Sequence, residues 1–239
     1  MSKHLFKPVS VLLFVFKALS ENDIYIINPC ASLDKVFLTK KLAISKPLAP
    51  LGPLIPLQKP PMLSYIHDNN DAIDFREAHD TGKPVSLERL ASLGLIYKHF
   101  DDQEDVDSFA KERNYKNRDI VNISKDSFPN QQAMLDKLAV FYAEHLHEDE
   151  EIRYCLDGEG YFDVRDPFTE EWIRCKLNKG DLLVLPAGIY HRFTLTSSNY
   201  IKALRLFKEE PKWQAYNRPE ADSNPYRKEY LSQVQAGTV

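Results

Sequence analysis

Downstream of Met62 the chain is divided into short apolar segments by polar and glycine-rich stretches. Several short strands at regular intervals are typical of a β-sandwich or barrel. The expected strands cover residues 63–66, 152–156, 161–165, 172–177, 182–185, 191–195 and 201–207. Asp157-Gly158-Glu159-Gly160 separates the second from the third, and its composition predicts a hairpin turn. The pattern therefore predicts a mainly β domain.

Helical spacing of apolar residues interrupts this pattern in three places. The expected helices lie within residues 87–93, 102–113 and 130–142. Ser86 is a good N-cap for the first of them, and Gly94 is placed to end it. Met134 and Leu138 mark the apolar face of the third. Residues 213–230 are polar with scattered aromatic side chains, and we expect them to wrap the surface of the domain.

Residues 1–61 differ in composition from the rest of the chain. They hold eight of the 15 prolines and carry a net charge of +5, whereas the whole chain has a formal charge of −4. Prolines recur at every third position from Pro47 to Pro56, which favours an extended polyproline II spacer. We therefore expect a disordered extension over 1–61, with Met62 as a plausible natural start, and one domain over 62–239.

An apolar run, Val9 to Phe16, lies within this extension. It follows two lysines, as in a weak signal peptide, but it is too short to span a bilayer. A targeting role and packing against the domain both remain open from the sequence. We expect no stable association with a membrane.

Composition restricts the class of protein further. The 239 residues include three cysteines, Cys30, Cys155 and Cys175, an odd number without the spacing of a metal site. Reduced thiols in the cytoplasm are the simplest interpretation, and Cys155 and Cys175 lie in apolar strand patterns. Basic residues do not cluster with aromatic residues, so we expect no nucleic-acid partner.

The candidate chemistry lies in two separate stretches. In the first stretch, Glu144-His-Leu-His147 is followed by Glu151. The second stretch runs from Gly180 to His191 and ends with that histidine. Alternate side chains of an extended segment share a face, so His145, His147 and Glu151 would lie together. This parity also leaves Asp149 open as the carboxylate. Three imidazoles and one carboxylate suit a first-row divalent metal and leave two positions of an octahedral ion open.

The two stretches together resemble the paired motifs of the cupin superfamily. Gly158 follows Glu151 at the first motif's spacing, which favours Glu151 over Asp149, and Pro186, Gly188 and His191 form the second motif. The resemblance implies a double-sheet β-barrel, or jelly roll, with a few peripheral helices. Ala139 and Leu195 depart from the usual motifs, but neither is at a ligand position.

A narrower resemblance is carried by longer strings. They are Tyr65-Ile-His-Asp-Asn69, Asn117-Arg-Asp-Ile-Val-Asn122, Glu151-Ile-Arg-Tyr154, Gly160-Tyr-Phe-Asp-Val-Arg-Asp166, Trp172-Ile-Arg174, Gly188-Ile-Tyr-His-Arg-Phe193 and Ala203-Leu-Arg-Leu-Phe207. These strings resemble the acireductone dioxygenase family over roughly Met62 to Tyr230. The resemblance implies that His145, His147, Glu151 and His191 bind one Fe(2+) or Ni(2+) per chain.

The resemblance also implies a reaction in methionine salvage. The substrates would be dioxygen and the acireductone 1,2-dihydroxy-5-(methylthio)pent-1-en-3-one. With iron the products would be 4-methylthio-2-oxobutanoate and formate. With nickel they would be 3-methylthiopropanoate, formate and carbon monoxide. We expect a monomer located in the cytoplasm, with the nucleus as a second compartment.

Two further residues are candidates for substrate contacts. Arg153 lies two residues beyond Glu151, on the same strand face, where its guanidinium would stabilise an enediolate anion. Phe193 stands in the same relation to His191 and would flank the substrate. A surface ion pair for Arg153 and plain core packing for Phe193 are the competing interpretations. Another cupin decarboxylase or isomerase, or a non-catalytic cupin binding module, is the alternative function.

Overall fold

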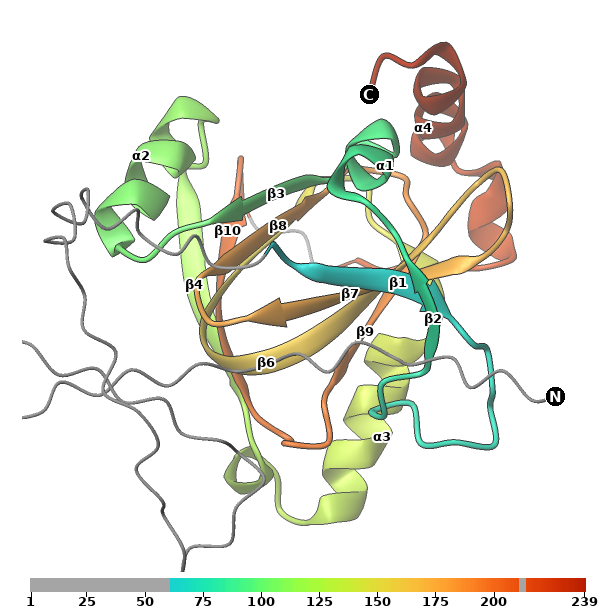
Figure 1. Ribbon diagram of the computed structural model, residues 1–239. Coiled ribbons are helices and arrows are strands. Elements are labelled where there is room, and N and C mark those ends of the chain that lie inside the picture. The colour runs from blue at the N-terminus through green and yellow to red at the C-terminus, as the bar shows by residue number, and fades with distance from the viewer. Residues whose placement is uncertain (1–60, 211–213) are drawn as a thin grey trace, which may run out of the picture. The chain divides into compact units, whose positions relative to one another are not determined.

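Short antiparallel strands dominate the computed structural model, which describes residues 61–210 and 214–239 (Figure 1). The strands are β1 Leu63–His67, β2 Asp80–Pro84, β3 Ile96–His99, β4 Asn117–Ile123, β5 His145–Leu146, β6 Glu151–Arg165, β7 Trp172–Asn178, β8 Asp181–Leu185, β9 His191–Leu195, β10 Ile201–Phe207 and β11 Tyr216–Asn217. The helices are α1 Leu87–Ser92, α2 Gln103–Glu112, α3 Gln131–Tyr142 and α4 Pro225–Ala236, with short 3₁₀ turns at Lys125–Ser127 and Glu220–Ser223. The mainly β fold class is confirmed.

The strands form two sheets that share β6. Sheet A has the order β11-β5-β9-β6-β7-β1-β2. In sheet B, β3 pairs with β8, β8 and β10 flank the first half of β6, and β4 pairs with β10. Because one long strand belongs to both sheets, they close on each other as the double-sheet barrel that the cupin resemblance implies.

The hairpin expected at Asp157–Gly160 is wrong, because β6 runs through these residues without reversing. Gly158 has a φ of +74°. The register against β10 also shifts between Lys202 and Ala203. This irregularity is a β-bulge, which bends a strand and inserts one extra residue. A glycine with positive φ suits a bulge as well as a turn, so composition alone did not separate them.

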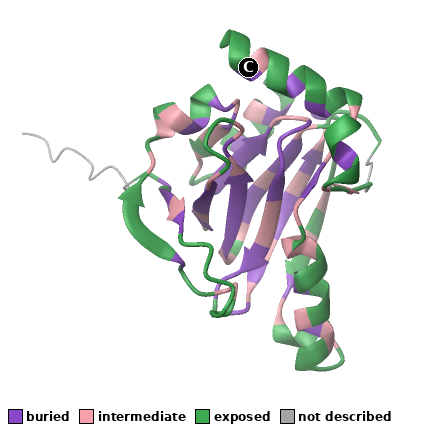
Figure 2. Ribbon diagram, turned by 90° about the vertical axis from the view of Figure 1, so that its right-hand side faces the viewer, coloured by how far each residue is buried: buried purple, intermediate pink, exposed green. Residues whose placement is uncertain are grey.

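The bulge also reverses the parity of β6. Before it, odd-numbered residues such as Arg153 and Cys155 face the barrel interior; after it, even-numbered residues such as Phe162 and Val164 do. One strand therefore lines the interior along its whole length. Figure 2 shows the strands as largely buried, whereas the helices present exposed residues on their outer sides.

The three expected helices are confirmed within one or two residues. The Ser86 hydroxyl accepts from the backbone N–H of Arg89, and Asn130 caps α3 through Ala133 in the same way. Met134 and Leu138 of α3 pack against sheet residues that include Leu195. This packing places α3 along β9, the strand that begins with His191.

No helix was expected in the C-terminal segment, but residues Pro225–Ala236 form α4. Trp213 lies outside the described residues. Asn224 accepts from the backbone N–H of Tyr226, Pro225 stands in the first turn, and Gly237 ends the helix. These signals were present in the sequence. The helix was missed because only Arg227, Tyr230 and Val234 are buried, which is a weak apolar pattern.

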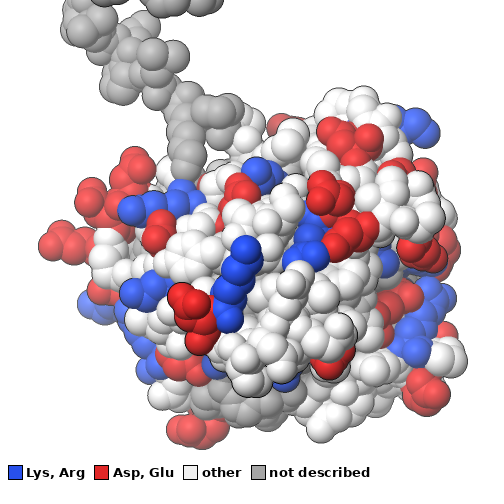
Figure 3. Space-filling view, turned by 90° about the horizontal axis from the view of Figure 1, so that it is seen from below, with Lys and Arg blue, Asp and Glu red and all other residues white. Residues whose placement is uncertain are grey.

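The expected extension over 1–61 lies outside the described residues, apart from Pro61. Within the described residues, no helix is long and apolar enough to cross a membrane. Figure 3 shows basic and acidic side chains interspersed over one face of the molecule, without a broad patch of either sign.

Candidate metal centre

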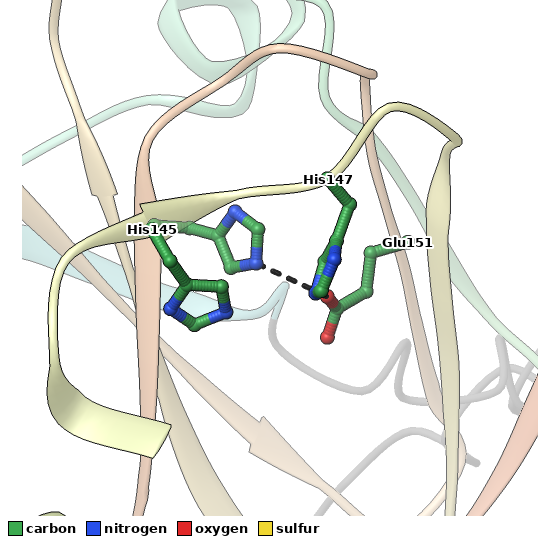
Figure 4. Close-up of side chains that lie close together, drawn as sticks. His145, His147 and Glu151 are labelled. Carbon is green, nitrogen blue, oxygen red and sulfur yellow. Dashed lines mark hydrogen bonds and ion pairs between the residues drawn. The ribbon is translucent and has the colours of Figure 1, made fainter. Parts of the chain in front are cut away.

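Three strands and the residue that follows β5 bring the four expected ligand residues together. His145 lies on β5 and pairs with His191 at the start of β9, while Glu151 is the first residue of β6. One ligand atom from each of these residues and from His147 lies within 4.8 Å of the others. Figure 4 shows the side chains of His145, His147 and Glu151 pointing toward a common space.

The route to this cluster differs from the expected one. The segment from His145 to Glu151 does not stay extended, because β5 ends at Leu146 and the chain bends before β6 begins. Strand parity therefore does not place Glu151 beside the histidines. Glu151 instead joins them as the first residue of β6, where it pairs with Leu185 of β8. Asp149 lies in the bend, is exposed, and does not belong to the ligand cluster.

Each of the three histidines binds a backbone carbonyl through Nδ1. His145 Nδ1 lies 2.7 Å from the oxygen of Ala143, and His191 Nδ1 lies 3.0 Å from that of Ile189. His147 Nδ1 lies 2.6 Å from the oxygen of Gln214. A carbonyl only accepts hydrogen bonds, so Nδ1 carries the proton in each ring. Nε2 of each neutral ring is then left with a lone pair for an ion.

Glu151 is the single buried anion of this group. Its Oε2 lies 3.2 Å from Nε2 of His147 and 3.1 Å from Nε2 of His191, and its Oε1 lies 3.0 Å from Arg153. Burial raises the pKa of Glu151. The charges of Arg153 and His191 lower it by more, so the pKa lies well below its usual value. Burial lowers the pKa of His145 to about 4. Both directions favour the protonation states that bind a metal.

The geometry therefore fits a divalent cation. Three imidazole nitrogens and one carboxylate converge, and each imidazole is held by a hydrogen bond at Nδ1. Nitrogen and carboxylate donors in this number suit first-row transition metals.

A cavity of about 330 Å³ lies next to these residues. Its wall is largely apolar and includes Val121, Ile123, Val140, Phe141, Phe162, Leu177, Phe193, Ile201 and Ala203. Charged side chains of Lys137, Lys208, Glu209 and Glu210 also border it. A small molecule with one polar end beside the ligand cluster and one apolar end matches this lining.

Arg153 and Phe193 both line this cavity. Arg153 forms an ion pair with Glu151 itself and not with the exposed part of the acidic run. Phe193 packs at 4.9 Å from the ring of Phe162 and at 6.3 Å from that of Phe141. Core packing and substrate contact are therefore compatible for Phe193, since it packs on two other rings and also lines the cavity.

Sequence reasoning missed Arg205. It lies on β10 directly opposite Arg153 of β6 and lines the same cavity. Its guanidinium binds both carboxylate oxygens of Asp119 at 2.7 Å. Arg205 alternates with Ala203 and Ile201, so strand parity would have placed it inside the barrel if the pairing of β10 with β6 had been known.

The two described cysteines are buried and free. Burial raises the pKa of the Cys155 thiol to about 12 and also raises that of Cys175. Both thiols are therefore protonated and unreactive, as expected for the interior of a barrel.

Comparison with known proteins adds to this geometry. The model of the ARD/ARD′ family matches residues 64–215. An acireductone dioxygenase from Saccharomyces cerevisiae is 60% identical over 172 residues, which cover 71% of this chain and 96% of that protein. One from Yarrowia lipolytica is 55% identical over 175 residues, which cover 73% of this chain and all of that protein.

A solved structure supports the fold. Acireductone dioxygenase from Bacillus anthracis, with a cadmium ion in its active centre, superimposes with a TM-score of 0.50 at 20% sequence identity. The superposition covers 64% of this chain and 96% of that one. This chain therefore shares its cupin-type barrel fold with the Bacillus anthracis enzyme.

Proposed function

The chain belongs to the ARD/ARD′ family of acireductone dioxygenases, and we propose that His145, His147, Glu151 and His191 bind its catalytic metal. Membership in this family makes the chain a dioxygenase with a small acireductone substrate, as part of methionine salvage. It also sets aside the alternative of a cupin decarboxylase or isomerase and that of a binding module.

The Nδ1 hydrogen bonds are the observation that best supports the ligand assignment. All three rings are fixed by carbonyls at 2.6 to 3.0 Å, and each presents Nε2 to the cluster. Such partners fix the tautomer and the orientation of a metal-binding imidazole. Ordinary core packing gives no reason for three neighbouring histidines to share this hydrogen-bond pattern.

We propose that the metal is Fe(2+) or Ni(2+), one per chain. When bound, it would supply a positive charge that activates the enediol oxygens and, with iron, redox activity toward dioxygen. The donor set suits both ions, since imidazole and carboxylate bind each of them. The cadmium ion of the Bacillus anthracis relative is consistent with a divalent cation at such a site.

We propose that Arg153 and Phe193 contact the substrate. The acireductone is an enediol, and its anion needs a cation close to its oxygens. The guanidinium of Arg153 lies at the cavity wall beside Glu151, where it would stabilise that anion. Phe193 belongs to the apolar wall that would exclude water and hold the methylthio end of the substrate.

The test is reconstitution of metal-free protein with each metal separately. The Fe(2+) protein should convert the acireductone and dioxygen to 4-methylthio-2-oxobutanoate and formate. The Ni(2+) protein should release 3-methylthiopropanoate, formate and carbon monoxide. Chromatography and gas analysis measure these products, and the same products from both metals would contradict the proposal.

We further propose that the protein is a monomer of the cytoplasm, with the nucleus as a second compartment. Reduced, buried thiols and a surface with mixed charges are consistent with this. Sedimentation of the purified chain and imaging of a fluorescent fusion test the two statements separately.

A further inference from the structure

A buried group of charged and aromatic side chains lies on the outer face of sheet A, behind β9. Asp163 of β6 accepts hydrogen bonds from Arg174 of β7 at 2.7 and 2.9 Å. It also accepts from Arg192 of β9 at 2.8 Å. Asp163 and Arg174 are excluded from solvent, so breaking either ion pair would leave a buried charge without a partner. These contacts therefore hold three neighbouring strands together.

Arg192 joins this group to the metal centre through the backbone of β9. It follows His191 directly, and successive side chains of a strand point to opposite faces. His191 faces the ligand cluster, while Arg192 lies directly opposite Asp163 in the sheet. The ion pair therefore fixes the register and the orientation of the strand that carries His191.

Arg192 also contacts the segment that leads to His145. Its guanidinium lies 4.1 Å from the centre of the Tyr142 ring, at the end of α3, and 4.3 Å from that of Trp172. The chain leaves α3 at Tyr142, and the carbonyl of Ala143 is the hydrogen-bond partner of His145 Nδ1. One side chain thus touches both segments that deliver the paired histidines.

His67, Asp68 and His79 extend this group behind Tyr142, and their side chains are close enough to one another to hold a cation. Their ring nitrogens are already engaged, however. His67 Nδ1 accepts from a backbone N–H at 2.9 Å, and His67 Nε2 lies 3.2 Å from the Tyr142 hydroxyl. His79 is paired with Asp68 at 2.7 Å and with the Asp74 carbonyl at 2.9 Å. These residues therefore support Tyr142 and do not form a second ion site.

We propose that Arg192 is a positioning residue of the metal centre. Through its ion pair with Asp163 and its stacking on Tyr142, it holds His191 and His145 at the spacing that the ion requires. Arg192 itself contacts neither the ion nor the substrate. This inference rests on the proposed metal centre, so its test must separate failure of the centre from failure of the positioning role.

The experiment is a titration of metal-free protein with Co(2+), followed by visible absorption. Arg192→Met should weaken Co(2+) binding roughly tenfold or more, as expected when a group that orients a metal ligand is lost. The absorption bands at saturating Co(2+) should also shift, because the ligand geometry changes.

The matched control is Arg165→Met. Arg165 also stacks on Trp172, at 5.1 Å, but its ion pair is with Glu170 and not with Asp163. Its removal should leave the affinity and the absorption bands unchanged.

A second pair of variants keeps the test decisive if Arg192→Met does not fold. Tyr142→Phe retains the ring under Arg192 and should bind Co(2+) like the wild type, whereas Tyr142→Leu should bind it more weakly. Wild-type affinity and absorption bands in Tyr142→Leu, and in Arg192→Met if it folds, would overturn the positioning role. A wild-type protein that binds no Co(2+) would instead overturn the proposed metal centre.

Discussion

At the scale of single residues, the hydrogen-bond partner of each histidine decides which ring nitrogen faces the His/Glu cluster. His145 and His191 bind carbonyls two residues earlier in the chain, so their orientation is fixed locally. His147 binds the carbonyl of Gln214, which is 67 residues away. The orientation of His147 therefore depends on the docking of the C-terminal segment, which no local pattern encodes.

The ligand assignment predicts a ranking of three variants. His191→Ala and Glu151→Ala should lose the metal, with affinity falling by more than the roughly 10- to 100-fold that loss of an outer partner causes. Asp149→Ala should be mild, because Asp149 is exposed and lies outside the cluster. Metal content of the purified proteins checks this ranking. Near-normal metal in Glu151→Ala, with loss in Asp149→Ala, would mean that the carboxylate is wrongly assigned.

His67 should make stability depend on pH. Its burial lowers the pKa to about 4 from 6.5, with Asp163 opposing and Arg174, Arg192 and His79 adding to the shift. The unfolded chain therefore binds a proton first as the pH falls. The free energy of unfolding should therefore be highest above pH 6.5. It should fall between pH 6.5 and 4, by on the order of 3 kcal/mol from His67 alone.

Denaturant unfolding of metal-free protein at several pH values measures this dependence. The free energy of unfolding of His67→Gln should fall less steeply than that of the wild type across the same pH range. Parallel curves for the two proteins would show that His67 does not contribute.

At the scale of the elements, β6 determines the shape of the barrel interior. Its first half supplies Glu151 and Arg153 from odd positions, and its second half supplies Phe162 from an even position. The bulge near Gly158 makes both halves face inward, and it passes the strand from sheet B to sheet A. The same strand thus carries both Glu151 and part of the apolar wall of the cavity.

Gly158→Ala should destabilise the protein. A Cβ at this position would lie 2.4 Å from the carbonyl oxygen of Tyr200, and the φ of +74° is unfavourable for alanine. We expect a loss of roughly 1–3 kcal/mol, which lowers the melting temperature by several degrees. Gly82→Ala is the matched control, because Gly82 also has a positive φ but no atom within 4 Å of the added Cβ. Equal effects of the two substitutions in a thermal melt would rule out the contact with Tyr200 as the cause.

At the scale of the whole molecule, the C-terminal segment closes against both ligand-bearing loops. β11 pairs with β5, and Arg227 of α4 donates to the carbonyl of Gly188. The backbone N–H of Gly188 in turn donates to the carbonyl of His147. The metal centre is thus held by residues from the middle and the end of the chain.

A chain that begins at Met62 should fold and bind metal like the full chain. Met62 is buried in the core, and the family match begins at residue 64. If residues 1–61 packed on the domain, their removal would lower the melting temperature, since about 1 kcal/mol corresponds to roughly 2–4 °C. Melting temperature, Co(2+) affinity and turnover of the two chains check this. A fluorescent fusion of residues 1–61 that leaves the cytosol would show a targeting role instead.

The sequence by itself determined the local elements and the identity of the ligand candidates. Ser86 and Asn130 mark helix starts because their side chains bind nearby backbone N–H groups, and such bonds depend only on neighbours. The spacing of His145, His147, Glu151 and His191 identified one cluster, which the structure brings together. The strands β7 to β10 could be predicted because each contains enough apolar residues to be recognised without knowing which strand pairs with it.

Only the tertiary structure decided how these parts face one another. Whether Gly158 forms a turn or a bulge depends on the strand that pairs with it, so the interior parity of β6 followed from β10. Arg205 and Gln214 reach the site through pairings with segments far away in the chain. Nothing in the sequence indicated that Asp163, Arg174 and Arg192 interact; the pairing of three strands brings them together and buries Asp163 and Arg174. Long-range pairing is absent from local composition, and it is what converts these residues into a site.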